Sequence, residues 1–158
     1  MTSRLFTTRE VSRITALSLR QLQWWAEHGV LVPTQHKHSR QYTEADLFAA
    51  MLYRELRARH VPLSDVRRVQ RQVRAQKLPL PHPLYRWLLT NGTRTALLIG
   101  AADVLAFQCE RRTPAYHVIS LAALESRMRD GIAALDAPCR VMPQRETWSA
   151  NLHTRAIA

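Results

Sequence analysis

Cysteine, histidine and glycine are scarce or scattered in this chain, and their arrangement argues against several kinds of site. The two cysteines, Cys109 and Cys139, are too few for a disulfide framework or a four-cysteine zinc site, so we expect ordinary thiols. His82, His117 and His153 lie far apart and suggest neither a metal site nor a catalytic Cys–His pair. The four glycines form no phosphate-binding loop, which argues against a nucleotide-driven enzyme. We therefore expect no cofactor, no metal and no enzymatic activity.

Long apolar stretches are also missing. The longest, residues 96–102, falls well short of the roughly 18 residues that would span a bilayer. The N-terminus lacks the apolar region of a signal peptide, so we expect a cytoplasmic protein with no membrane partner. Hydrophobic residues still make up 46% of the chain, which is enough for one sizeable core or two small ones.

Acidic residues are few: 12 Asp and Glu stand against 23 Lys and Arg, which gives a formal net charge of +11 and a pI near 11.1. Residues 1–77 carry 14 of the basic and 6 of the acidic residues, so most of the excess lies in the N-terminal half. Clustered cations concentrate phosphate polymers, and this balance therefore favours a polyanionic partner. A basic soluble protein without such a partner is the alternative.

Prolines mark the clearest boundary in the chain. Pro79, Pro81 and Pro83 remove backbone donors at close intervals, so no helix should continue through them. We predict a mainly α-helical N-terminal domain over residues 1–77, a Pro-rich linker over 78–83 and a small α+β domain over 84–136. Residues 137–158 show no clear period, and we expect a tail that is loosely ordered or wraps another subunit.

The N-terminal domain should begin with two short helices. Thr7 or Thr8 is a good N-cap for the first, and Ser18 caps a second that ends where Gly29 suits a left-handed position. Helical spacing predicts that the inner face of this second helix carries Leu19, Leu22 and Ala26. Its outer face should carry Arg20, Gln21, Trp24 and His28. Trp25 faces sideways, so the spacing leaves open whether it is buried or exposed. Two helices joined so tightly predict a helix-turn-helix, although ordinary helical hairpins share this pattern.

A hairpin and two more helices should complete this domain. Residues 30–33 are apolar and residues 34–41 basic and polar, which suggests a small hairpin, or wing, with an exposed tip. Thr43 caps a third helix, and a fourth begins near residues 62–64. Spacing predicts buried side chains at Leu47, Phe48, Met51, Leu52 and Leu56 of the third helix and at Val66, Val69 and Val73 of the fourth. The arginines of the fourth helix should point outward, as a solvated face or toward phosphate: Arg67, Arg68, Arg71 and Arg74.

The C-terminal part mixes helix and strand signals. Residues 84–89 favour a short helix, and Asn91 with Gly92 indicates a turn. Residues 95–99, 104–108 and 116–119 are typical of strands. A last helix starts at Ser120 with an apolar stripe that forms either core or a seam with a partner helix: Leu121, Leu124, Met128, Ile132 and Leu135.

Four ordered motifs resemble the MerR family of bacterial regulators. In residues 17–31, Trp24 and Trp25 stand where that family has an aromatic pair, and residues 29–31 stand where it has Gly-Leu-Leu. Residues 39–42 resemble its wing sequence Y-R-x-Y, residues 43–47 its helix entry S-E-E-D-L, and residues 60–67 its segment G-F-S-L-x-E-I-R. The matches follow the family's spacing and cover about residues 5–76, half of the chain.

This resemblance implies a winged helix-turn-helix that binds double-stranded DNA. Helix 18–28 would enter the major groove, where Arg20 could read guanine and Gln21 adenine, each bidentate pair giving about 1–3 kcal/mol of discrimination. Trp24 would contact sugar and phosphate, and wing 34–42 the backbone or the minor groove. The residues expected at the DNA are Arg9, Ser18, Arg20, Gln21, Gln23, Trp24, His36, Lys37, His38, Arg40 and Tyr42, although Tyr42 could instead anchor the wing on the third helix.

Several positions depart from the family. Gln23 stands for its usual Arg, Ala26 for its usual Glu, and residues 38–39 for Gly-Tyr in the wing. The prolines also stop the long helix through which family members typically dimerise. A homodimer would then use the C-terminal domain, with the apolar stripe of residues 121–135 as first candidate. That domain loosely resembles a small αβ appendage of MerR-like proteins encoded beside toxin–antitoxin genes, which implies a protein partner or a second subunit.

We therefore favour a sequence-specific, nucleoid-associated transcriptional regulator. A repressor or autoregulator is favoured over a ligand-gated activator, because no effector domain with a recognisable pocket follows. One alternative is an antitoxin or an excisionase-like architectural protein that bends DNA, with a C-terminal module for a toxin or another regulator. Another is a small hydrolase or ligand-sensing module in residues 84–135, for which the expected strands offer only Thr95, Gln108 and Tyr116 as polar groups.

Overall fold

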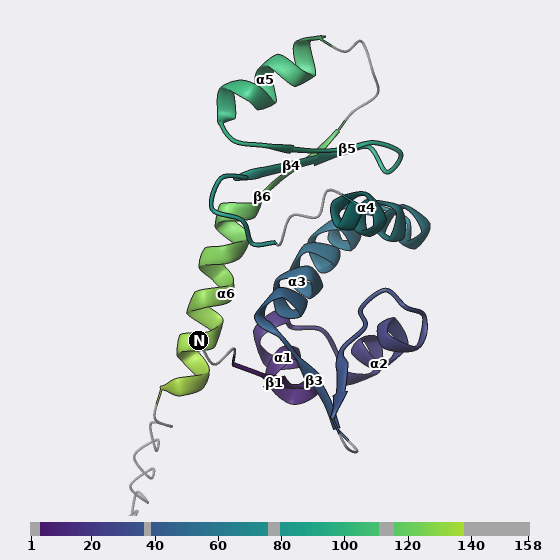
Figure 1. Ribbon diagram of the computed structural model, residues 1–158, viewed down its shortest axis with the longest axis vertical. Coiled ribbons are helices and arrows are strands. Elements are labelled where there is room, and N and C mark those ends of the chain that lie inside the picture. The colour runs from purple at the N-terminus through teal and green to yellow at the C-terminus, as the bar shows by residue number, and fades with distance from the viewer. Residues whose placement is uncertain (1–3, 37–38, 76–79, 111–115, 138–158) are drawn as a thin grey trace, which may run out of the picture.

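The computed structural model describes residues 4–36, 39–75, 80–110 and 116–137, which contain six helices and two small sheets (Figure 1). The N-terminal elements are β1 (Phe6–Thr7), α1 (Thr8–Thr15), α2 (Leu19–Glu27), β2 (Thr34–His36), β3 (Ser39–Tyr42), α3 (Glu44–Ala58) and α4 (Leu63–Ala75). The C-terminal elements are β4 (Trp87–Thr90), β5 (Thr95–Leu98), α5 (Ala101–Glu110), β6 (His117–Ser120) and α6 (Leu121–Asp136). The described chain is thus mostly helical.

Side-chain caps explain where the helices begin. Helices α1, α2 and α3 each open with a capping box, in which the cap hydroxyl and the side chain three residues later satisfy each other's backbone N–H. The pairs are Thr7 with Glu10, Ser18 with Gln21, and Thr43 with Asp46. Ser120 caps α6 by accepting from the N–H of Ala123. These four starts confirm the predicted ones, and each cap contributes about 1 kcal/mol.

Gly29 ends α2 in the predicted left-handed conformation, with a φ of 66°. The N–H of Val30 donates to the carbonyl of Trp25 at 2.9 Å, and the N–H of Gly29 donates to that of Ala26 at 3.2 Å. This is a Schellman motif, which satisfies carbonyls that the end of the helix would otherwise leave open. It fixes the point at which the chain leaves α2 for the wing.

Two antiparallel three-stranded sheets accompany the helices. β3 lies between β1 and β2, so the strand before α1 holds one side of the β2–β3 hairpin. β4 lies between β5 and β6, with residues 91–94 as the β4–β5 turn. The predicted turn at Asn91 and Gly92 is confirmed, as are strands close to 95–99 and 116–119. Helix α5 lies on the face of this second sheet that points away from α4 (Figure 1).

Two predictions in the C-terminal part are wrong. Residues 84–89 form no helix; instead, Trp87–Thr90 is the central strand β4, which pairs with two strands later in the chain. Residues 104–108 form no strand but lie in α5, at whose start Asp103 Oδ2 accepts from the N–H of Gly100 at 2.8 Å. Short apolar runs look alike in buried strands and helices, which accounts for both errors.

One hydrophobic core joins the N-terminal and C-terminal parts. Helix α6 runs from the second sheet along α3 and α1 (Figure 1). Leu88 of β4 and Ile119 of β6 lie in the same buried cluster as Leu47 and Leu56 of α3. The boundaries predicted at residues 77 and 84 therefore separate two architectures that share a core. All five apolar side chains predicted to be inward on α3 are buried.

The apolar stripe on α6 serves this core rather than an open seam. Leu121, Leu124 and Met128 are at most 2% exposed and pack within the cluster of their own chain. Ile132 and Leu135, the other two residues predicted at a dimer contact, are half-buried. Of the two interpretations of this stripe, core or dimer contact, the structure therefore supports core for Leu121, Leu124 and Met128, because a second subunit could not reach them.

Close contacts and ion pairs hold α6 beside α1 and α3. A Cβ built on Gly131 would lie 2.7 Å from Cγ2 of Ile14, so α6 approaches α1 too closely there for a larger side chain. Arg4 donates to Asp136 at 2.6 Å, and Arg127 donates to Glu55 on α3 at 3.3 Å. Because these pairs are partly exposed, they contribute little stability. They are nevertheless consistent with the packing of α6 along α1 and α3.

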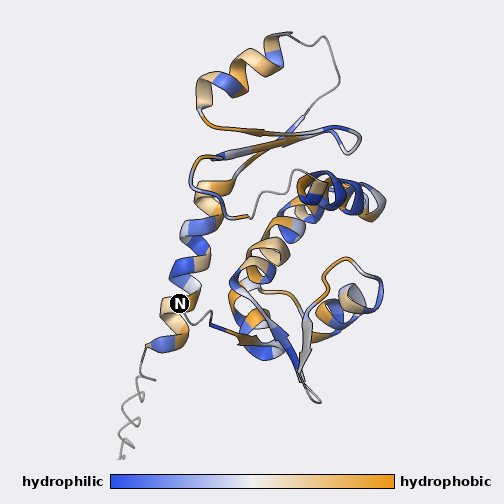
Figure 2. Ribbon diagram, in the orientation of Figure 1, coloured by the Kyte–Doolittle hydropathy of each residue, from blue (hydrophilic) through white to orange (hydrophobic). Residues whose placement is uncertain are grey.

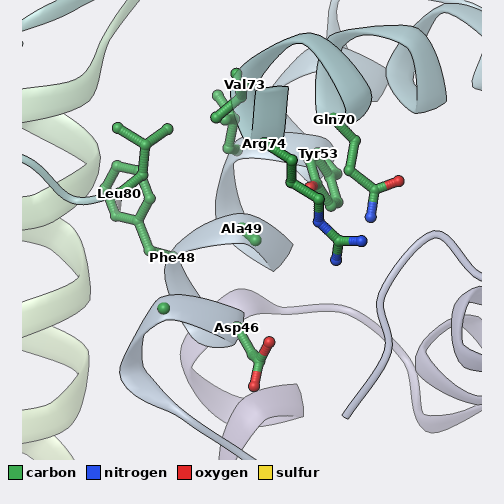
Figure 3. Close-up of a pocket in the computed structure, with 10 residues that line it drawn as sticks. Asp46, Phe48, Ala49, Tyr53, Gln70, Val73, Arg74 and Leu80 are labelled. Atoms are coloured by element: carbon green, nitrogen blue, oxygen red, sulfur yellow. The ribbon is translucent and has the colours of Figure 1, made fainter. Parts of the chain in front are cut away.

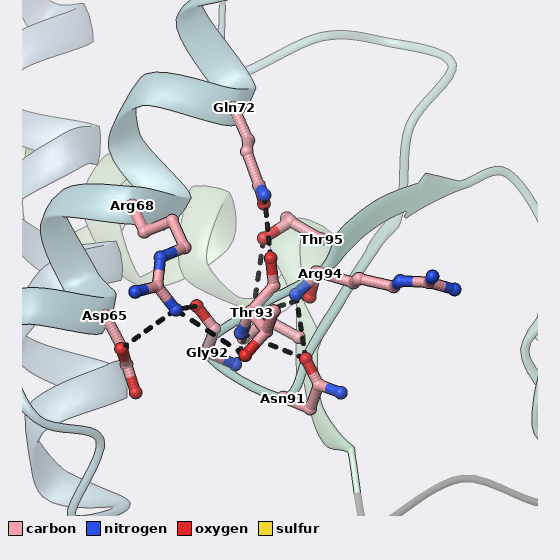
Figure 4. Close-up of polar contacts among 9 residues, drawn as sticks. Asp65, Arg68, Gln72, Asn91, Gly92, Thr93, Arg94 and Thr95 are labelled. Atoms are coloured by element: carbon pink, nitrogen blue, oxygen red, sulfur yellow. Dashed lines mark hydrogen bonds and ion pairs between the residues drawn. The ribbon is translucent and has the colours of Figure 1, made fainter.

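The β4–β5 turn rests on α4 (Figure 4). Arg68 Nη1 donates to the carbonyl of Gly92 at 3.3 Å, and Gln72 Nε2 donates to that of Thr93 at 2.9 Å. A Cβ on Gly92 would lie 2.8 Å from Cγ of Asp65, so the turn and the helix are in direct contact. Arg68 is therefore not the fully outward residue that helical spacing predicts.

Several expected features fall outside the described residues: Lys37 and His38 of the wing tip, residues 76–79 with the first two positions of the predicted linker, Cys139, and residues 138–158 of the tail. Leu80, within the predicted linker, and Tyr85, just after it, pack on the core. Within the described ranges, no helix is long and apolar enough to cross a membrane. In the same ranges, no group of three His, Cys, Asp or Glu side chains could hold a metal ion.

Candidate nucleic-acid interface

A tight turn orients α2 against α1. Ala16, in the left-handed region with a φ of 53°, ends α1, and only Leu17 and Ser18 separate it from α2. Thr15 Oγ1 donates to the carbonyl of Val11 at 2.7 Å, and Ser12 Oγ donates to that of Leu17 at 2.6 Å. Leu17 itself is buried, so the turn is fixed by packing as well as by hydrogen bonds. The result is a helix-turn-helix with a rigid second helix.

The inner face of α2 differs from the prediction in two positions. Leu22 is fully buried, and Trp25 is 6% exposed and packs edge-on against Tyr53 of α3. Leu19 is 49% exposed and Ala26 is half-buried, so the predicted core role of Leu19 is wrong. The buried positions of α2 are thus Leu22 and Trp25, three residues apart on one face. Trp25 is therefore a core residue, which is one of the two positions that the sequence had left possible for it.

Arg20 is the most available polar side chain on the outer face of α2. It is exposed, and it makes no hydrogen bond or ion pair within the described part of the chain. It stands in the first turn, beside the N-terminus of the helix. A long cation in this place can reach a base edge or a phosphate without breaking an internal contact.

Gln21 is committed to the helix cap, and this limits what it can read. Its Oε1 accepts from the N–H of Ser18 at 2.9 Å and from the hydroxyl of Ser18 at 3.1 Å. A bidentate contact with adenine needs the amide oxygen and nitrogen together. Reading of adenine by Gln21, as the sequence predicts, would therefore require the cap to open. The side chain of Gln23 is also engaged, because its Nε2 donates to Glu27 at 2.8 Å.

Trp24 borders an open groove beside α2. It is 40% exposed, and its ring stacks on His28 with a centroid distance of 4.0 Å and an interplanar angle of 24°. The groove has a volume of about 550 Å³ and is bounded on the α3 side by Arg54 and Arg57. Both arginines are exposed, and Arg57 donates to the carbonyl of Val61 at 2.7 Å. The groove thus combines an aromatic ring with two cations, which suits a sugar-phosphate chain.

Sequence reasoning missed Arg54 and Arg57. They are exposed positions of α3, each next in sequence to a buried residue, Tyr53 or Leu56, and no motif in the sequence draws attention to them. The spacing of α3 alone would have placed them outward, but only the fold brings them across from Trp24. Their position next to α2 depends on contacts between helices that are distant in sequence.

The wing carries fewer described contacts than the sequence predicted. Arg40 is half-buried on β3 and lines a shallow depression with Glu27 and Val32. Only the backbone of His36 is described, where it pairs with Ser39 at the end of β2. Tyr42 is fully buried, and this burial raises the pKa of its hydroxyl. Tyr42 therefore anchors the wing, and its predicted contact with DNA is wrong.

Arg9 is exposed on the first turn of α1, as expected of a phosphate contact. Within the described residues it makes no hydrogen bond or ion pair. Its neighbour Glu10 is used internally: the hydrogen bond from the N–H of Thr7 lowers the pKa of this carboxyl, which remains an anion in the capping box. Arg9 thus offers a free positive charge near the helix N-terminus.

Helix α4 supports the far end of α2. Arg67 Nη2 donates to the carbonyl of His28 at 2.9 Å, and Gln70 Nε2 donates to the carbonyl of Val30 at 2.8 Å. Gln70 is 6% exposed, although helical spacing gave it no buried role. Arg67 is half-buried and turned inward, so its predicted outward position is wrong, while Arg71 and Arg74 are exposed as predicted. The orientation of α2 thus depends on α4.

The N-terminal part of the chain has a counterpart among known protein families. Residues 6–73 match the protein family described as MerR HTH family regulatory protein. The matched range begins in β1 and ends in α4, so it contains the helix-turn-helix, the wing and the two supporting helices. No curated protein sequence matches the chain.

Proposed function

Residues 6–73 are a MerR-family helix-turn-helix region, and on this premise we propose that the chain is a sequence-specific regulator of transcription that binds double-stranded DNA. The observation that carries the proposal is the outer face of α2, where Arg20 stands exposed and without an internal partner beside the N-terminus of a rigid helix. A recognition helix needs such a side chain to reach base edges in the major groove.

In this proposal, α2 enters the major groove and its neighbours bind the backbone. Arg20 reads a base, most favourably guanine through O6 and N7. Trp24 packs on sugar and phosphate at the edge of its groove, and Arg54 and Arg57 contribute positive charge across from it. Lys37 and Arg40 of the wing and Arg9 of α1 contact further phosphates. These cations position α2 without reading sequence.

We infer that the protein acts by occupying its site, as a repressor or an autoregulator in the cytoplasm beside the nucleoid. The inference is supported by the path of the chain after α4. The Pro-rich linker leads into a small sheet and into α6, which folds back on α1 and α3 of the same chain. The described part of the chain thus offers no long helix that would couple two DNA-binding regions rigidly.

We also propose that the chain forms a homodimer through its C-terminal part. The contact surface is α5 and not the stripe on α6. Helix α5 has only two charged residues, and Figure 2 colours much of its length as hydrophobic. Among the described side chains of this helix only Val104 is buried, while Leu105 is 63% exposed and the preceding Ile99 is 56% exposed. Helices that are apolar around their circumference are normally covered. A second copy on α5 would cover these side chains and supply a second α2.

Light scattering tests the dimer. We expect twice the monomer mass for the wild-type chain and a monomer for Leu105→Glu, with an unchanged circular dichroism spectrum. A monomeric wild-type chain would contradict the dimer and favour the antitoxin alternative, in which the same surface covers a different protein.

A DNA-binding titration tests the function itself. The wild-type chain should bind duplexes with its selected sequence about 10³-fold or more tightly than scrambled duplexes at near-physiological salt. Equal affinity for both would contradict sequence-specific regulation and leave an architectural role.

A further inference from the structure

A small cavity lies between α3 and α4 and is separate from the groove at Trp24 (Figure 3). Its volume is about 160 Å³. Phe48, Leu52, Val73 and Leu80 give it apolar walls from both helices and from the linker. An apolar cavity of about this size can hold a benzene molecule. One six-membered ring is therefore the largest rigid body that it accommodates.

Polar groups from α3 and α4 meet at one side of the cavity. Tyr53 is 6% exposed, and in Figure 3 its hydroxyl lies beside the guanidinium of Arg74. Burial raises the pKa of Tyr53 to about 12, so the hydroxyl remains protonated and able to donate. Arg74 makes no hydrogen bond or ion pair within the described residues. A donor and an unpaired cation thus face the same space.

The one acidic side chain in the wall is already satisfied. Asp46 Oδ2 accepts from the N–H of Thr43 at 2.9 Å and from its hydroxyl at 2.8 Å. It also lies at the N-terminus of α3, where the helix dipole stabilises a negative charge. The charge of Asp46 is therefore stabilised within its own helix, whereas Arg74 has no acidic partner among the described residues.

We propose that this cavity binds a small aromatic monocarboxylate, with the ring between Phe48 and Val73 and the carboxylate on Arg74 and Tyr53. A guanidinium and a carboxylate form a charge-assisted pair of two parallel hydrogen bonds. The apolar walls select the ring, and the position of Arg74 at the exposed side lets the anion remain partly hydrated. A ligand of this class has about nine non-hydrogen atoms, for which about millimolar affinity is a realistic strength.

The cavity is also connected to α2. Gln70 lines it from α4 and donates to the carbonyl of Val30 at 2.8 Å, directly after the end of α2. One turn earlier, Arg67 holds the carbonyl of His28. A ligand that shifts α4 would therefore move the support of α2 and weaken DNA binding. This regulatory part rests on the proposed function, and by linkage DNA would weaken ligand binding by the same factor.

Binding is tested first without DNA, by titrating the full chain with benzoate and following amide chemical shifts. We expect saturable shifts at Phe48, Val73 and Gln70, and affinity for neutral benzamide that is lower by about tenfold or more. Arg74→Gln should reduce benzoate binding to the level of benzamide. Arg71→Gln, on the same helix but outside the cavity, is the matched control and should leave it unchanged.

A cavity-filling variant gives an independent test. Ala49 lines the cavity, and Ala49→Leu should abolish binding of both ligands while the amide spectrum stays dispersed. Shifts that do not saturate by about 10 mM, or equal binding by wild type and Ala49→Leu, would overturn the proposed site. Equal binding of benzoate and benzamide would overturn the role of Arg74.

DNA binding is then measured with and without saturating benzoate. The affinity of the wild-type chain should fall about fivefold or more, and that of Ala49→Leu should not change. Unchanged wild-type affinity with benzoate bound would refute the coupling to α2. Absence of DNA binding in every sample would instead refute the proposed function, while the titration without DNA would still decide the cavity.

Discussion

Replacing Arg20 by alanine tests how α2 reads DNA. Because Arg20 is exposed and makes no internal hydrogen bond or ion pair in the described structure, its loss should leave the fold and its stability unchanged. A bidentate contact with guanine supplies about 1–3 kcal/mol of discrimination. At 25 °C this range corresponds to a loss of roughly fivefold to 150-fold in affinity for the selected sequence. Affinity for a scrambled duplex should fall much less.

The assay is fluorescence anisotropy with labelled duplexes of both sequences at one salt concentration. Arg71→Ala is the matched control, since Arg71 is an exposed arginine on α4, away from the outer face of α2. The specificity ratio should collapse for Arg20→Ala and persist for Arg71→Ala. An equal loss on both duplexes would show that Arg20 contacts phosphate, and the reasoning about base reading would be refuted.

Three further predictions concern the wing, the shared core and a helix cap. Lys37→Ala combined with Arg40→Ala should reduce the slope of log affinity against log salt by up to about two, and an unchanged slope would remove the wing from the interface. Met128→Ala should lower the free energy of unfolding by about 2–5 kcal/mol in urea titrations, because Met128 is fully buried; Leu84→Ala, at a side chain that is 58% exposed, should change it by no more than about 0.5 kcal/mol. The hydrogen bond from the backbone N–H of Thr7 lowers the pKa of Glu10 from 4.5 in the folded protein. The stabilisation that this ionised carboxylate provides is therefore fully present above pH 4.5, and it is lost as the pH falls through the lowered pKa of the folded state. The stability of the wild type should therefore fall more steeply below pH 4.5 than that of Glu10→Gln, and parallel pH profiles would contradict the assignment.

Local signals predicted the N-terminal half well, because its helices begin and end with side chains that act within a few residues. Ser18 and Thr43 cap their own helices, and Gly29 supplies a positive φ where α2 stops. These interactions are complete within the segment that carries them. The sequence therefore predicted where α2 lies and which general surface it exposes.

The misplaced residues depend on neighbours that are distant in sequence. Trp25 is buried because Tyr53 of α3 lies against it, whereas Leu19 remains 49% exposed. Strand β4 exists because β5 and β6 pair with it. Hydrophobic spacing cannot distinguish these cases, since it reports that a side chain needs burial but not which element covers it.

In the candidate site, too, the residues that depend on local interactions could be predicted, and those that depend on distant segments could not. Arg20 could be chosen from the sequence, because an exposed arginine at the start of a recognition helix requires only local geometry. Gln21 could be placed on the outer face, but the sequence did not show that its amide oxygen also closes the capping box. Arg54 and Arg57 were missed, because α3 brings them to the groove at Trp24 only in the folded chain. The α6 stripe was open to two interpretations until its packing on α1 and α3 was known.

Sequence-specific DNA binding is the central claim, and selection from a random duplex library tests it most directly. The selected sequences should converge on one defined motif, repeated or inverted if two copies act together. Footprinting on the DNA upstream of the protein's own coding region should then protect that motif at near-physiological salt. Enrichment of nothing beyond A·T-rich or easily bent DNA, with no protected site, would contradict a regulator that reads sequence through α2.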